Sequence, residues 1–168
     1  MLTGGIRAGI HLDVAELNNI IIVDDFLEDP EELIRYAETA KFVLSEAYPG
    51  VQAMAPRYYI EAVYNLANKV MNKTIGRIRS KLSITTVERD NSPHVDSHID
   101  GEYAGVHYLF KGSHGGTIVG ETKIEPVFNR IVFYKANTPH KPDLNEGSYV
   151  NDVRTGRFTV VSMFGVSK

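Results

Sequence analysis

Apolar residues in the first half of the chain recur at helical spacing in two places. Before the first, Asp29 fits an N-cap, Pro30 fits the first helical position, and two glutamates complement the helix dipole. The second stripe runs from Arg57 to about Asn72. The pattern predicts two helices, whose apolar positions are Leu33, Ala37 and Ala40 in the first and Ile60, Val63, Tyr64, Ala67, Val70 and Met71 in the second.

The remaining apolar segments have the length and spacing of strands. A run at residues 20–23 predicts a buried strand within 19–27, while two prolines and a glycine predict a loop over 42–56. After residue 81, short apolar segments are separated by Gly, Pro, Asn and Asp. They predict strands over 82–88, 103–110, 117–119, 130–134 and 157–164.

Helices first and short strands later are typical of an α+β protein whose core is an antiparallel sandwich or jelly roll. We expect one domain over residues 1–168, with helical support at about 28–76 and a β core at about 82–166. A chain of this length can bury a hydrophobic core without disulfides or a structural zinc.

Composition narrows the classes of function. The formal net charge of −3 lacks the basic excess of a general nucleic-acid binder. The absence of cysteine excludes a disulfide framework, a thiolate metal site and a cysteine nucleophile. We found no apolar run long enough to span a membrane and no secretory leader pattern, so we expect a cytoplasmic protein that binds neither membranes nor nucleic acid.

Five of the six histidines lie within the 47 residues from His94 to His140. In His94-Val95-Asp96, an extended backbone points the imidazole and the carboxylate to the same side. His140 lies between Pro139 and Pro142, which favour an extended backbone there too. Two histidines and one carboxylate form the facial triad that holds non-haem Fe(II) with open positions.

Two further segments carry groups suited to a small organic acid. On a strand, Arg157 and Thr159 share a face, and a guanidinium with a hydroxyl can bind a carboxylate. Tyr108 offers a phenol hydroxyl soon after the His-x-Asp pair.

These motifs together resemble the 2-oxoglutarate and Fe(II)-dependent dioxygenases of the branch similar to prolyl 4-hydroxylases. The run PHVDSHIDGEYAGVHYLFKGSHGGT resembles the family's His-x-Asp, loop, Tyr-Leu strand and Gly-Gly-Thr sequence. NRIVFYKANTPH and TGRFTVVSMF resemble its distal-histidine and arginine strands, and IIIVDDFLEDPEELIRYA resembles its opening strand and helix. The chain is also similar to a small set of such proteins with a Pro-His-x-Asp motif and a terminal Arg-Thr-Gly-Arg.

The resemblance implies a double-stranded β-helix, or jelly roll, with N-terminal supporting helices. It implies that His94, Asp96 and His140 bind Fe(II) and that Arg157, supported by Thr159 and Tyr108, binds 2-oxoglutarate. The implied reaction consumes O2, releases succinate and CO2, and hydroxylates an unactivated C–H bond of a small-molecule or peptidyl substrate. Arg157 lies 17 residues after His140, which exceeds the family's usual gap, and residues 145–152 look like an inserted loop that could form a lid. Loops form the pocket walls in such folds, and here these loops are 42–56 and 145–152.

Competing assignments exist for several residues. A second pair, His98-Ile99-Asp100, has the same pattern, but a longer loop before the next strand and the preceding proline favour His94 and Asp96. We expect His98, Asp100 and His114 at the substrate rim, and Arg154 at the surface.

Two other classes of function remain open at this point. One is a non-catalytic jelly-roll module that binds a small ligand. The other is a cupin-type metal enzyme that does not use 2-oxoglutarate, although such sites usually carry a His-x-His pattern that is absent here.

Overall fold

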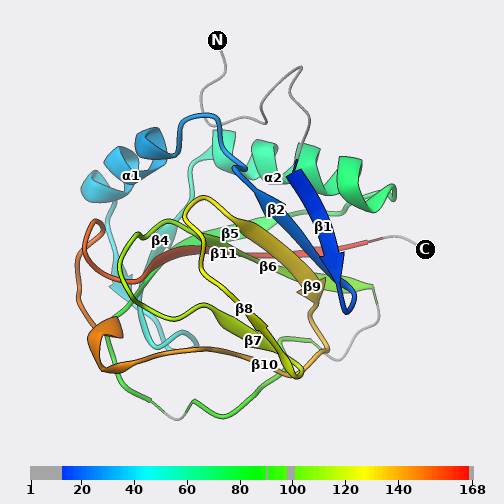
Figure 1. The fold of residues 1–168 in the computed structure, drawn as a ribbon. Helices are drawn as coiled ribbons and strands as arrows, with labels where there is room; N and C mark the ends of the chain where they lie inside the picture. Colours follow the sequence, from blue (N-terminus) through cyan, green and yellow to red (C-terminus); the bar gives the residue numbers. More distant parts are fainter. Residues whose placement is uncertain (1–12, 90, 98–100, 167–168) are drawn as a thin grey trace.

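The computed structural model describes residues 13–89, 91–97 and 101–166 (Figure 1). Within them an eight-stranded sheet has the order β1-β2-β9-β6-β11-β5-β4-β3, and a three-stranded sheet has the order β10-β7-β8. Every strand pairing in both sheets is antiparallel. The elements are β1 (Asp13–Leu17), β2 (Ile20–Asp24), α1 (Pro30–Thr39), β3 (Val43–Leu44), β4 (Gly50–Met54), α2 (Arg57–Met71), β5 (Arg79–Thr85), β6 (Glu102–Tyr108), β7 (Thr117–Val119), β8 (Thr122–Ile124), β9 (Ile131–Lys135), β10 (His140–Pro142), a 3₁₀ turn (Glu146–Ser148) and β11 (Phe158–Gly165).

Both helices lie where the apolar spacing predicts them. The Asp29 side chain accepts a hydrogen bond from the Glu32 amide and Pro30 occupies the first turn of α1, as expected for an N-cap followed by proline. Helix α2 ends at Asn72, which takes the left-handed conformation with φ of 50°. No helix among the described residues is long and apolar enough to cross a membrane.

The large sheet separates two apolar clusters. On one face, Leu82, Phe158 and Val160 pack with residues of α1 and α2, including Leu33, Tyr59 and Leu66. On the other face, a smaller cluster lies toward the three-stranded sheet and includes Val106, Tyr108, Val119, Val132 and Tyr134. Figure 1 shows this arrangement as helices, large sheet and small sheet in succession. Alternation along β6 and β11 therefore decides which side chains face the helices and which face the interior between the sheets.

The prediction of a loop over residues 42–56 is wrong. This segment contains β3 and β4, a hairpin that adds two strands to the edge of the large sheet. Pro49 lies in its turn and Pro56 precedes α2, so neither proline interrupts a strand. Val51 and Ala53 pack against the helix-side cluster, and this contact makes the segment a strand.

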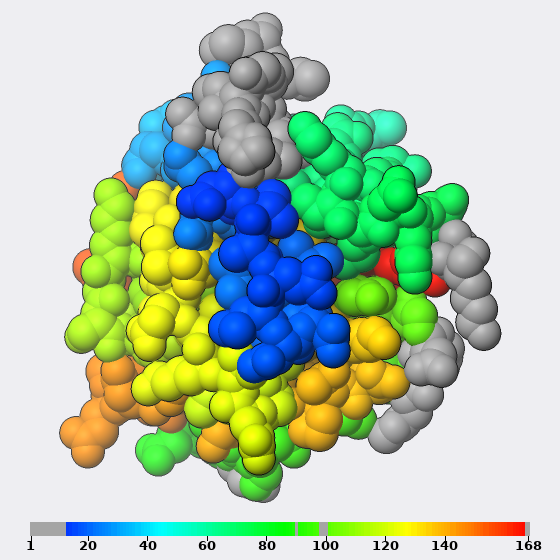
Figure 2. Space-filling model, turned by 45° about the vertical axis from the view of Figure 1, so that its right-hand side comes forward, coloured from blue at the N-terminus to red at the C-terminus, as the bar shows by residue number. Residues whose placement is uncertain are grey.

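The β-structure also begins earlier than predicted. Strands β1 to β4 precede residue 82, and β1 pairs with β2 along the edge of the large sheet. The predicted strand at 19–27 is confirmed only over Ile20–Asp24. All five residues of β1 are exposed, and Figure 2 shows them in deep blue on the surface near α2. An exposed strand has no buried face, so its alternation carries little sequence signal.

Candidate metal centre

Main-chain pairing brings His94 and His140 together. Each residue donates its amide to the carbonyl of the other at 2.9 Å, which forms an antiparallel bridge beside β10. The amide of Asp96 donates to the carbonyl of Ala136, also at 2.9 Å. The segment at 91–97 is therefore anchored along the polypeptide that leads into β10, in the extended form that its sequence predicts.

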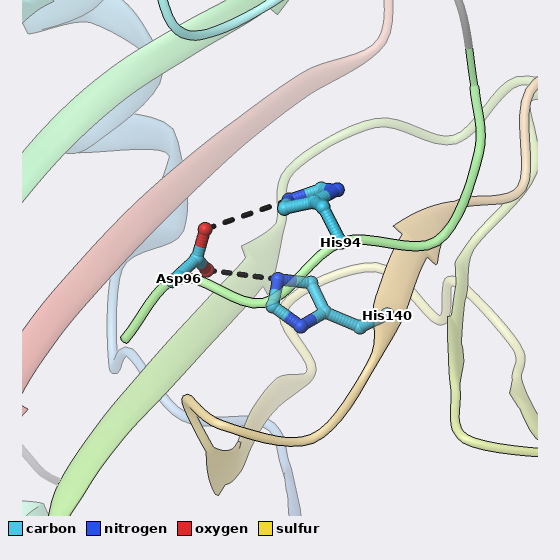
Figure 3. A group of neighbouring side chains, drawn as sticks. All are labelled: His94, Asp96 and His140. Carbon is cyan, nitrogen blue, oxygen red and sulfur yellow. Dashed lines mark ion pairs between the residues drawn. The ribbon is translucent and has the colours of Figure 1, made fainter. Parts of the chain in front are cut away.

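The three side chains converge at one point (Figure 3). Asp96 Oδ2 lies 2.8 Å from His140 Nε2, and Asp96 Oδ1 lies 3.4 Å from His94 Nε2. The candidate ligand atoms all lie within 4.8 Å of one another. His140 is almost entirely buried, whereas the His94 side chain is 53% exposed. The group thus has one side embedded in the protein and one side accessible.

The orientation of His140 suits metal binding. Its Nδ1 lies 2.8 Å from the carbonyl oxygen of Thr138, which can only accept, so Nδ1 carries the proton. Nε2 is then the ring nitrogen that faces Asp96, and it is the atom of His140 that would coordinate a metal ion. The ring of Tyr134 packs against His140 with centroids 4.8 Å apart. Hydrogen bonding and packing therefore fix the ring before any ligand binds.

The Asp96 carboxyl group has a lowered pKa. Burial raises this pKa, but the hydrogen bond from His140 and the charges of the two imidazoles together outweigh burial. Asp96 is therefore ionised at neutral pH. Two imidazole nitrogens and a carboxylate oxygen at these distances fit a divalent transition-metal ion such as Fe(II).

A cavity of about 200 Å³ opens beside the three side chains. Besides His94, Asp96 and His140, its lining combines polar with apolar groups: Ala47, Tyr48, Pro49, Gln52, Val106, Thr117, Tyr134, Pro142, Arg157, Thr159 and Val161. Arg157 and Thr159, which the sequence pairs on one strand face, thus line the same cavity as the histidines.

Arg157 is held by two main-chain carbonyls. Nε donates to the Gly115 carbonyl at 3.0 Å, and Nη2 donates to the Gly116 carbonyl at 2.8 Å. These two N–H groups lie on one edge of the guanidinium plane, and no described residue forms a hydrogen bond with the edge made by Nη1 and the outer N–H of Nη2. Arg157 is 2% exposed, and its guanidinium lies over the Phe110 ring. A buried guanidinium with one edge available suits a bidentate carboxylate.

Tyr108 is not among the residues that line this cavity. It is fully buried, and its hydroxyl donates to Thr117 Oγ1 at 2.7 Å. Burial raises the pKa of Tyr108 to about 12, despite the hydrogen bond to Thr117. Since Thr117 does line the cavity, Tyr108 supports the wall and keeps its proton at neutral pH.

Comparison with known proteins places the chain in a family. The model of DUF6445, described as a family of unknown function, matches residues 8–119. The chain belongs to this family. The matched region includes His94 and Asp96 and ends before His140. No curated protein matches the sequence.

Two solved structures resemble this DUF6445 protein in fold. A prolyl-4-hydroxylase from Pseudomonas putida superposes with a TM-score of 0.55 at 16% identity, covering 89% of this chain and 94% of its own. The collagen prolyl hydroxylase of Paramecium bursaria Chlorella virus-1, solved with 2OG, gives a TM-score of 0.51 at 11% identity, covering 90% of this chain and 97% of its own. These similarities establish a shared fold over nearly the whole chain.

The structure places His114 and Arg154, two other residues that the sequence singles out, outside the lining of the metal cavity. His114 hydrogen-bonds the Thr155 carbonyl through Nε2 at 2.9 Å and lines a different depression, with Lys123 and Asp143. Arg154 forms exposed ion pairs with Glu31 and Glu38 of α1. The second pair, His98 and Asp100, lies outside the described residues.

Sequence reasoning missed three polar groups of the cavity wall. Tyr134 lies on a predicted strand, and its alternation with Val132, which belongs to the inter-sheet cluster, could have placed it inside. Tyr48 and Gln52 lie in the segment 42–56, which the sequence placed in the pocket wall as a loop without assigning any of its side chains to the cavity. The predicted lid segment at 145–152 contributes no residue to the described lining.

Proposed function

We propose that this DUF6445 protein is a non-haem Fe(II)- and 2-oxoglutarate-dependent oxygenase that hydroxylates an unactivated C–H bond. The observation that carries the proposal is a group of two histidines and one carboxylate at a cavity that also contains a buried arginine. The two histidines and the carboxylate would hold a metal ion that keeps open coordination positions, and the arginine would bind a dicarboxylic co-substrate in the same cavity.

The strand order supports a jelly roll as the scaffold. Eight strands can be counted along the chain from β5 to β11 if the short bridge at His94 is taken as the second strand, between β5 and β6. Four of the eight lie side by side in the large sheet, in the order β5-β11-β6-β9. The other four lie as the His94 bridge, β10, β7 and β8. This division between two facing sheets is expected for a double-stranded β-helix built of Greek keys.

Each side chain then has a defined role. His94, Asp96 and His140 would hold Fe(II), and Arg157 would bind the distal carboxylate of 2-oxoglutarate through its Nη1 and Nη2 edge. Bound Fe(II) supplies the activation of O2, coupled to conversion of 2-oxoglutarate to succinate and CO2. The apolar side chains of Val106 and Val161 line the same cavity and limit the access of water to it.

Anaerobic titration with Fe(II) and 2-oxoglutarate tests the proposal. We expect a weak visible metal-to-ligand charge-transfer band in the wild-type protein, and succinate formation once O2 is admitted. Asp96→Ala should abolish both signals because it removes the anionic ligand. Asp100→Ala is the matched control for the competing pair and should retain both.

Arg157→Lys tests the carboxylate site separately. A point charge cannot replace the two-pronged contact, so the 2-oxoglutarate concentration for half-maximal signal should rise about tenfold, equivalent to about 1.4 kcal/mol. Arg154→Lys changes a residue that forms exposed ion pairs with Glu31 and Glu38 and does not line the cavity, so it should leave this concentration unchanged. A wild-type protein that gives neither band nor succinate would refute the proposed function.

A further inference from the structure

The floor of the metal cavity continues outward along the large sheet. Cross-strand register aligns side chains of one sheet face in rows, because directly opposed residues point the same way. In one row Val106 of β6 opposes Val161 of β11, and Val161 opposes Lys81 of β5. Lys81 in turn opposes Met54 of β4. Since Val106 and Val161 line the cavity, Lys81 and Met54 lie on the same face, one and two strands farther out.

A second row runs beside it in the same direction. Thr159 and Gln52 both line the cavity and are joined across Ser83, which opposes each of them. Gln52 also opposes Val43 on the edge strand β3. Leu82 and Ile84 alternate with these β5 residues and pack on the helix side, which confirms that Lys81 and Ser83 face the cavity side.

The outer part of this face forms a groove of about 470 Å³. It shares Ala47 and Gln52 with the metal cavity, so the two spaces adjoin. Two apolar side chains on this face are exposed, since Val43 is 58% and Met54 is 65% exposed. Leu44, at the edge of the groove, opposes Val51 and lies on the other side of the edge strand. Exposed apolar side chains grouped beside a cavity are typical of ligand-binding surfaces.

The charges of the groove favour an anion at its floor. Lys81 is exposed in this row, and although its carbonyl accepts a hydrogen bond from the Ser83 hydroxyl, its ammonium group makes no hydrogen bond or ion pair with a described residue. Lys41 also lines the groove, and the carboxylate among the described lining residues, Glu46, lies in the hairpin turn rather than on the floor. Arg79, two residues before Lys81, shares a separate depression with Glu102. Lys81 is therefore the cation best placed for a ligand that reaches the metal cavity.

We propose that this groove binds the primary substrate, and that the substrate is a small molecule with a carboxylate next to an apolar chain. The carboxylate pairs with Lys81 and the apolar chain covers Met54, Val43 and Val161. That the bound molecule is a substrate rests on the proposed oxygenase function, whereas its binding to the groove does not.

Two fluorescent probes test the binding without metal. The anion 8-anilinonaphthalene-1-sulfonate and the uncharged N-phenyl-1-naphthylamine share their aromatic rings and differ in the sulfonate. We expect Lys81→Gln to weaken binding of the anion about 1.5- to fivefold, the range for an exposed ion pair, and to leave the neutral probe unchanged. Glu46→Gln should strengthen binding of the anion, Met54→Ser should weaken both probes, and Lys73→Gln, an exposed lysine beyond α2, should alter neither.

Salt gives a second readout of the same contact. The affinity of the wild-type protein for the anionic probe should fall as ionic strength rises, and this dependence should be reduced in Lys81→Gln. Equal responses of the two probes to Lys81→Gln, or an unchanged salt dependence, would overturn the assignment of Lys81.

Turnover separates this proposal from the proposed function. With Fe(II), 2-oxoglutarate and O2, decanoate should stimulate succinate formation more than decanamide does, and Lys81→Gln should abolish the difference. Equal stimulation by the amide would overturn the carboxylate assignment and leave the oxygenase function intact. Probe binding that depends on Lys81, with no succinate formed under any condition, would support the groove and refute the oxygenase.

Discussion

His107 belongs to β6, faces α2 and is fully buried, and its ring makes two hydrogen bonds. The amide of Asn129 is oriented by Leu27, whose N–H donates to Oδ1 and whose carbonyl accepts from Nδ2. Oδ1 is therefore an acceptor, so His107 donates to it from Nε2 at 2.9 Å. Nδ1 then accepts from the Tyr59 hydroxyl at 3.1 Å. The neutral ring satisfies all of these partners, which explains a histidine in the core that binds no metal.

Burial lowers the pKa of His107 to about 4, although its hydrogen bond to Asn129 raises it. In the unfolded chain the pKa is near 6.5, so below that pH the unfolded state takes up a proton that the folded state excludes. The proton uptake of the unfolded state lowers the free energy of unfolding, which is unaffected by the titration of His107 above pH 6.5 and declines as the pH falls from 6.5 toward 4. We expect this residue to contribute about 3 kcal/mol to the loss, from a shift of roughly 2.5 pKa units.

His107→Gln tests this dependence. Glutamine keeps a donor and an acceptor but lacks the ring that packs against Phe26 and Tyr59, so the variant should be less stable at neutral pH. Because glutamine does not titrate, the variant should lose less stability than the wild-type protein between pH 6.5 and 4. Urea denaturation at several pH values measures both effects. A variant with the same pH slope as the wild-type protein would show that His107 is not responsible.

At the scale of elements, the turn between β6 and β7 holds Arg157. Its glycines are required by close contacts: a Cβ on Gly115 would lie 1.4 Å from the Asp143 carbonyl oxygen, and one on Gly116 would lie 1.9 Å from that of Ile124. The carbonyls of the same two glycines accept the hydrogen bonds of the guanidinium. The packing of this turn thus determines the position of the arginine.

Gly115→Ala should therefore affect both stability and ligand binding. The clash is with main chain, so the turn must shift, at a cost of about 2 kcal/mol or more in the free energy of unfolding. Affinity for 2-oxoglutarate should also fall. Gly147→Ala is the control, because the added Cβ would lie 3.5 Å from its nearest neighbour, Asn145 Oδ1, which is an ordinary contact distance. This variant should change the free energy of unfolding by less than about 0.5 kcal/mol. Chemical denaturation measures the free energy of unfolding of both variants, and titration measures their affinity for 2-oxoglutarate. If Gly115→Ala and Gly147→Ala gave the same two values, the turn would not hold Arg157.

Elements set by local signals could be predicted from the sequence, while those set by pairing could not. Asp29 and Pro30 determine the start of α1 through contacts within one turn of helix. The hairpin at 43–54 depends on β5, which lies about thirty residues farther along the chain. The wall residues Tyr48 and Gln52 belong to that hairpin, so the sequence placed their segment at the pocket but could not tell which of its side chains face the cavity.

At the scale of the whole molecule, the metal centre joins two distant parts of the chain. Asp96 and His140 are 44 residues apart in sequence, and the sequence alone proposed them from residue type and resemblance. The tripeptide pattern itself is the same in both His-x-Asp pairs, so the preference for His94 and Asp96 rested on the longer loop before the next strand and on the preceding proline. The bridge between His94 and His140 brings the first pair to the distal histidine, and such pairing is a property of the fold rather than of the motif.

A metal ion that binds only the folded protein should stabilise it. At a concentration of Co²⁺ one hundred times its Kd, the gain is about 2.7 kcal/mol, which differential scanning fluorimetry detects as a rise in Tm of several degrees. Asp96→Ala should lose this rise and Asp13→Ala, on the exposed strand β1, should keep it. Excess chelator should reverse it. An equal rise in both variants would place the metal elsewhere.

The two main-chain hydrogen bonds between His94 and His140 have an entropic consequence. Folding of the small sheet already fixes the backbone of both ligands, so little conformational freedom remains to be lost when a cation arrives. The free protein is thus preorganised, as a chelator with a rigid frame is. Release of the ion by local unfolding needs only this short ladder to open, and the helix-covered large sheet can stay folded meanwhile.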